Sequence, residues 1–73
     1  LMVTYKSIAT KEDQLFLSNC RRILGHHKFN SLVPSVRHAF QAAYRNEPNE
    51  NKKVNVARRA ANMIYTKAMG EKI

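Results

Sequence analysis

The chain has 73 residues, with 13 Lys or Arg against 5 Asp or Glu, and a formal net charge of +8. Its length allows one domain with a thin core, because a chain this short buries only about 60% of the surface it exposes when unfolded. An apolar content of 44% predicts a folded chain. No apolar run approaches the roughly 20 residues of a transmembrane helix, so no membrane span is predicted.

The one cysteine, Cys20, cannot form a disulfide within the chain. This favours a reducing compartment, and we expect an intracellular protein of the cytoplasm or nucleus. His26, His27 and His38 lack the paired short spacings of zinc sites, so we expect no metal and no cofactor. Cys20 lies on an apolar helix face, where cysteine usually fills the core. Without a nucleophile motif or a carboxylate pair, we do not expect an enzyme.

Residues 1–9 are predicted to form an arm or a short extra helical turn. Val3 and Tyr5 alternate with polar residues as in a strand, but a lone strand has nothing to pair with. We expect Val3, Tyr5 or Ile8 to lie on the rest of the domain.

The first helix is predicted over residues 10–25. Thr10 can cap it, and the carboxylates of Glu12 and Asp13 suit the positive end of the helix dipole. Gly25 is a plausible stop in a left-handed conformation. The predicted apolar face consists of Phe16, Cys20, Ile23 and Leu24.

A short connection is predicted over residues 25–31, with Phe29 folding back onto the core. The second helix is predicted over 31–46. Ser31 or Asn30 would cap it, and Pro34 would stand in its first turn, where a missing N–H costs nothing. Its apolar face consists of Val33, Val36, Phe40, Ala43 and Tyr44.

The third helix is predicted over residues 51–69, after a turn-rich break at 46–51 and with Gly70 past its end. Tyr44 and Tyr65 are expected at the edges of their faces, with the hydroxyl groups in water. The apolar face consists of Val54, Ala57, Ala61, Ile64 and Ala68. The fold class is therefore all-α, a small three-helix bundle with short links.

Basic residues dominate the exposed helix faces, because residues 14–46 and 51–70 contain no acid. The simplest interpretation is an ordinary solvated surface. However, repulsion among like charges at a net charge of +8 weakens the folded state and stabilises nothing in the fold. We therefore expect a nucleic-acid-binding domain, acting as a regulator, for example of transcription, or as an auxiliary module of a larger complex. The candidate phosphate contacts are Arg21, Arg22, Lys28, Arg37, Arg45, Lys52, Lys53, Arg58 and Arg59.

The sequence does not separate DNA from RNA. The break before the third helix is too long for a helix-turn-helix, and Arg21 stands where that motif takes a small residue at the earlier turn. Zinc-finger spacing, an aromatic single-strand platform and a Gly-rich phosphate loop are all missing.

A mixed stripe on the third helix supports an alternative function. Val56, Arg59, Met63 and Lys67 form a candidate protein interface, since a flexible Met beside Arg is common at protein contacts. The partner would be a second copy, or an acidic protein on which this chain docks as an interaction module or a small inhibitor. The competing interpretation is that this side packs against the arm or the first helix.

Overall fold

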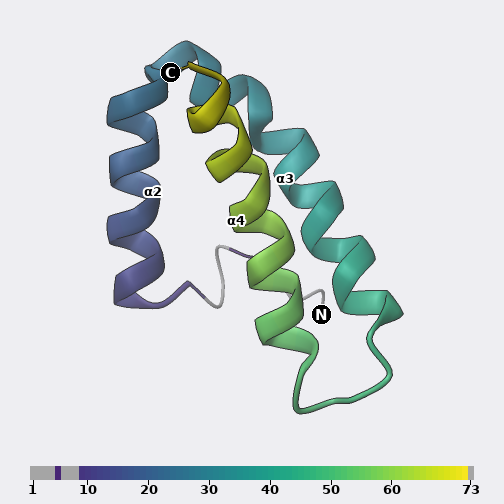
Figure 1. Cartoon of the computed structure of the whole chain (residues 1–73). Helices are drawn as coiled ribbons and strands as arrows, with labels where there is room; N and C mark the ends of the chain where they lie inside the picture. Colours follow the sequence, from purple (N-terminus) through teal and green to yellow (C-terminus); the bar gives the residue numbers. More distant parts are fainter. Residues whose placement is uncertain (1–4, 6–8, 73) are drawn as a thin grey trace.

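The computed structural model describes Tyr5 and residues 9–72. Three helices run up, down and up: α2 (Lys11–Leu24), α3 (His26–Asn46) and α4 (Lys53–Lys72). In Figure 1, α2 and α3 diverge from the end that they share, and α4 lies between them in this view. The described residues contain no strand, so the predicted all-α three-helix bundle is confirmed. Val3 and Ile8 lie outside the described residues.

The start of α2 follows the predicted capping pattern. The Thr10 hydroxyl accepts a hydrogen bond from the Asp13 N–H at 3.2 Å, and the Asp13 carboxylate accepts one from the Thr10 N–H at 3.1 Å. This reciprocal pair satisfies two N–H groups that would otherwise lack partners at the helix start.

The predicted connection over 25–31 is wrong, because Gly25 alone links α2 to α3. Its φ of +87° and ψ of 155° turn the chain within one residue, in a region that side chains rarely allow. Its N–H closes α2 on the Arg21 carbonyl at 2.9 Å, and its carbonyl accepts from the Phe29 N–H at 3.0 Å.

Because α3 begins at His26, Phe29 lies on the same helix face as Val36 and Phe40, and all three are buried. Asn30 and Ser31 therefore do not cap α3, and Pro34 lies inside the helix rather than in its first turn. We attribute this to the burial of Phe29, which outweighs the backbone hydrogen bond that proline cannot donate.

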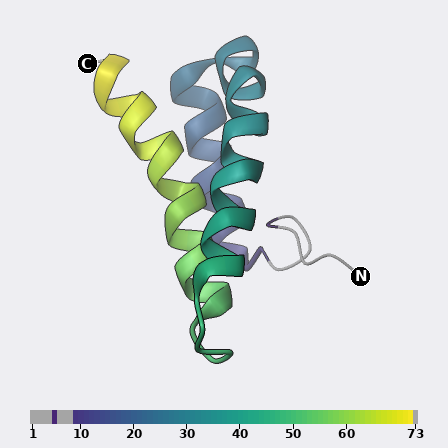
Figure 2. The same cartoon turned by 90° about the vertical axis from the view of Figure 1, so that its right-hand side faces the viewer.

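Helix α4 extends past Gly70 to Lys72, beyond its predicted end. Ala57, Ala61 and Ala68 are buried, and these small side chains let α4 approach its neighbours closely. Helices α3 and α4 pack against each other more extensively than α2 packs against either. Figure 2 shows α3 and α4 close together near the loop that joins them, with α4 leaning away toward its C-terminal end.

Aromatic rings fill the space that the alanines leave. Tyr65 is 3% exposed and stacks on Phe29, with the ring centroids 4.7 Å apart, so its predicted wet edge position is wrong. Phe40 stacks between Tyr5 and Tyr44. The predicted core position of Cys20 is confirmed, since this residue is fully buried. Ile23 lies at the edge of its face and stays 43% exposed.

The two glycines offer a matched test of this fold. We expect Gly25→Ala to lower the free energy of unfolding by about 1–3 kcal/mol, because a side chain strains the backbone at this φ. A Cβ at either glycine meets open space, so steric clash does not contribute. Gly70→Ala, inside α4, should leave the stability unchanged or raise it by up to about 1 kcal/mol. Urea unfolding of both variants measures the difference, and equal effects would contradict the strained turn.

Candidate functional site

The fold separates acidic from basic side chains along the bundle. The start of α2 and the loop between α3 and α4 lie at the same end of the molecule (Figure 1). Glu12, Glu47 and Glu50 belong to this end, whereas Glu71 belongs to the opposite end. The middle of the bundle and the α2–α3 link are left strongly positive.

Five exposed side chains gather at the link between α2 and α3, and we call them the junction patch: Arg21, Arg22, His26, His27 and Lys28. Arg21 and Arg22 stand in the last turn of α2, where the helix dipole favours cations. Lys28 stands in the first turn of α3, where the dipole opposes its charge. That turn contains no acid, and no side chain caps it. An anion bound at the start of α3 would offset the charge of Lys28 and would take the place of the missing acid and cap.

Local contacts orient parts of the patch. The Arg21 guanidinium lies 4.9 Å from the centroid of the Phe29 ring, over its face. Arg22 donates to the Asn19 side chain at 3.2 Å. His26 lies within hydrogen-bonding distance of Asn30, at 3.1 Å. Lys28 lines a small hollow together with Glu71.

The remaining predicted phosphate contacts do not join this patch. Arg37 and Arg45 are exposed along α3, and Arg59 is exposed on α4. Lys52 is exposed at the acidic end. Lys53 is partly buried: its ammonium donates to the Tyr44 carbonyl at 3.1 Å and lies over the Tyr44 ring.

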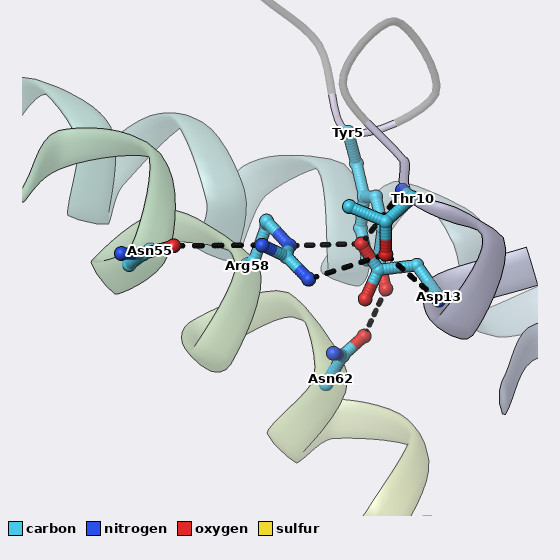
Figure 3. A network of polar contacts seen from close by, with 6 residues as sticks. All are labelled: Tyr5, Thr10, Asp13, Asn55, Arg58 and Asn62. Atoms are coloured by element: carbon cyan, nitrogen blue, oxygen red, sulfur yellow. Dashed lines mark hydrogen bonds and ion pairs between the residues drawn. The ribbon is translucent and has the colours of Figure 1, made fainter.

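Arg58 forms contacts within the fold and is not fully exposed. Its Nε lies 2.8 Å from the Asp13 carboxylate in an ion pair, and its side chain is 24% exposed. Figure 3 shows the guanidinium also reaching Thr10 and Asn55, both at 3.4 Å. We call this group of side chains, with Tyr5 and Asn62, the polar knot. It joins the start of α2 to α4.

Tyr5 completes the knot from the N-terminal segment. Its hydroxyl donates to the Asn62 side chain (Figure 3). Burial, together with the negative charge of Asp13, raises the pKa of Tyr5 to about 12, so the hydroxyl stays protonated as a donor. The prediction that a residue of the arm lies on the bundle is confirmed by Tyr5, which is buried against Phe40. The partnership of Asp13 with Arg58 gave no local signal, because the two residues lie on different helices.

The predicted stripe on α4 is largely open to solvent. Met63 is 66% exposed, Arg59 and Lys67 are exposed, and Val56 is half-buried. The interpretation in which this side packs against α2 does not hold for Met63, because the described residues leave most of it uncovered.

The other candidate chemistry concerns Cys20 and metal ligands. Burial raises the pKa of the Cys20 thiol, which disfavours the reactive thiolate. Within the described residues, no group of three or more His, Cys, Asp or Glu could hold a metal ion. Over the same residues, no helix combines the length and the apolar character that crossing a membrane requires.

Comparison with protein families, with curated proteins and with solved structures finds no match for this chain.

The polar knot predicts an acid-sensitive fold. Burial alone would raise the pKa of Asp13, but bonds from Arg58 and Thr10 outweigh it and hold the pKa below its ordinary value of 3.8. A lowered pKa contributes stability above that ordinary value, and the contribution disappears as the pH falls through the lower, folded-state pKa.

We therefore expect the free energy of unfolding to fall between about pH 5 and pH 2, and to fall less steeply in Asp13→Asn. Denaturant titrations across this range measure the slope. Glu12→Gln removes the same charge from the exposed neighbouring position and should keep the wild-type slope. If both variants flatten the profile equally, the knot is not the cause.

Proposed function

We propose that this chain is a small nucleic-acid-binding domain whose primary contact with phosphates is the junction patch. The observation that carries the proposal is the gathering of exposed basic side chains at an uncapped, acid-free helix start. Cationic side chains and free N–H groups at a helix N-terminus are both phosphate ligands in protein–nucleic acid complexes.

The ion pair within the polar knot supports the same proposal. Asp13 and Arg58 cancel each other, so the net charge of +8 belongs entirely to the other residues. The acids that remain are concentrated at the end opposite the patch, apart from Glu71. A polyanion approaching the patch therefore meets little repulsion, and its association would be steered by the field of the whole domain.

The first test is the dependence of binding on salt. We expect the affinity for duplex DNA or RNA to fall steeply with rising salt, with a slope of about −0.9 per phosphate contacted on duplex DNA. Fluorescence anisotropy with labelled duplexes measures this slope. Binding that does not change with salt, or the absence of binding at low salt, would contradict the proposal.

A pair of double variants locates the contact. Replacing Arg22 and Lys28 with Gln should weaken binding about tenfold at low salt and make the slope shallower by roughly two phosphate contacts. The control replaces Lys11 and Lys52 with Gln, which removes the same charge from exposed positions at the acidic end. Equal losses in both double variants would show that net charge alone, rather than the patch, determines binding.

The exposure of Met63 supports a second candidate function, a protein interface on α4. We propose that the stripe of Val56, Arg59, Met63 and Lys67 contacts a protein partner, the simplest being a second copy of this chain. Its mixed composition, an apolar centre flanked by cations, resembles that of interface cores and their rims.

Met63→Glu tests the interface. Because Met63 is mostly exposed, we expect the variant to fold with an unchanged melting temperature and to lose self-association in sedimentation experiments. A marked fall in melting temperature would show that Met63 supports the fold instead. Wild-type protein that stays monomeric at millimolar concentration would rule out the homodimer.

A further inference from the structure

A groove of about 840 Å³ lies between α2 and α3, and Tyr5 and Ala9 of the N-terminal segment also line it. It shares one residue, Arg21, with the junction patch and none with the α4 stripe. Leu17 of α2 and Val33 of α3, each half-buried, belong to opposite walls. Deeper in, the groove reaches Phe29 and Tyr65, whose stacked rings form part of the core. A cleft of this volume and lining is within the usual range of binding sites.

The rim of the groove is basic. Arg21 lies on the α2 side and Arg37 on the α3 side, and both are exposed. None of the described residues that line the groove is acidic. The groove therefore combines apolar and neutral polar side chains with two cations, one from each helix, and its described lining contains no carboxylate to neutralise them.

Arg21 is held ready for an anionic partner. Its guanidinium carbon lies over the Phe29 ring, 4.9 Å from the centroid. A guanidinium can form paired hydrogen bonds with a carboxylate. Restriction of the side chain by this ring contact lowers the entropy lost on binding.

We propose that this groove docks an acidic amphipathic helix of a protein partner. Bulky apolar side chains of that helix would contact Leu17 and Val33, and its carboxylates would pair with Arg21 and Arg37. In this common mode of peptide recognition, an amphipathic helix lies in an apolar groove and contacts it through apolar side chains spaced about one helical turn apart. The domain would then connect a nucleic acid at the junction patch to a protein in the groove.

The lining favours a peptide over a nucleic acid. The aromatic rings at the base of the groove are almost wholly buried, Phe29 being 5% and Tyr65 3% exposed, so neither offers a face on which a base could stack. Phosphates would use the two arginines but leave the apolar walls without a partner. An acidic amphipathic helix would pair with the two arginines and also cover the apolar side chains of the groove.

The experiment selects binders from a displayed library of random 16-residue peptides, using the folded full chain as target. We expect the enriched peptides to combine acidic residues with bulky apolar residues at helical spacing. Their binding to wild-type protein is then measured by fluorescence anisotropy, and amide NMR shifts identify the contact. The shifts should centre on Leu17, Val33 and Arg37.

Two variants of α3 make the measurement specific. Arg37→Glu should weaken peptide binding at least tenfold, because it reverses a charge on the rim. Arg45→Glu makes the same charge change on the same helix, at an exposed position that does not line the groove, and should change binding less than threefold. Circular dichroism checks folding; if Arg37→Glu unfolds, Arg37→Gln replaces it, with a several-fold loss expected.

Three results would overturn the groove proposal without touching the junction patch. The first is enrichment of acidic peptides that lack apolar anchors. The second is an equal loss of binding in the Arg37 and Arg45 variants. The third is a shift pattern confined to the junction patch, with peptide binding lost in the Arg22 and Lys28 double variant. Failure to enrich any binder would overturn it as well.

Discussion

The one-residue turn at Gly25 is the constraint on which the other features depend. Since α2 and α3 are joined without a loop, their facing ends are fixed together. Their other ends lie apart (Figure 1). The junction patch exists because this turn brings the last turn of one helix against the first turn of the next. The groove exists because the two helices separate from that point.

At the other end of α2, the polar knot holds the start of this helix against α4. No connecting loop joins the two helices there, and α2 packs less extensively than α3 and α4 pack against each other. The buried Asp13 is satisfied by the capping N–H of Thr10 and by Arg58, so one carboxylate both starts a helix and fixes its position. Burying a charge is costly unless it is paired, which makes this contact demanding in its geometry. We infer that it specifies how α2 is placed, while the apolar α3–α4 contact supplies most of the stabilisation.

Local sequence signals explain which parts of the fold were predictable. The cap at Thr10, the stop at Gly25 and the alanine-rich face of α4 depend on neighbouring residues, and each was recovered. The predicted start of α3 is five residues too late because Asn30, Ser31 and Pro34 together resemble a helix start. The burial of Phe29 against Tyr65, a contact between distant segments, overrides that local preference. The prediction of Arg58 as a phosphate contact fails for the same reason, since its partner Asp13 lies on another helix.

The structure also changes how the charge of this chain is understood. Counted along the sequence, the basic residues appear spread over every helix, which favours no particular surface. In the fold, Arg58 and Lys53 are engaged internally, three of the four acids other than Asp13 lie at one end, and the exposed cations at the other end flank an uncapped helix start. Repulsion among Arg21, Arg22 and Lys28 lowers stability, and Glu71 is the one acid at that end of the bundle. A surface that costs stability in the free domain is most readily explained by a partner that removes the cost on binding. In the proposed function the groove beside Arg21 has a different role, because phosphate would leave its apolar side chains without a contact and the proposed amphipathic helix would cover them.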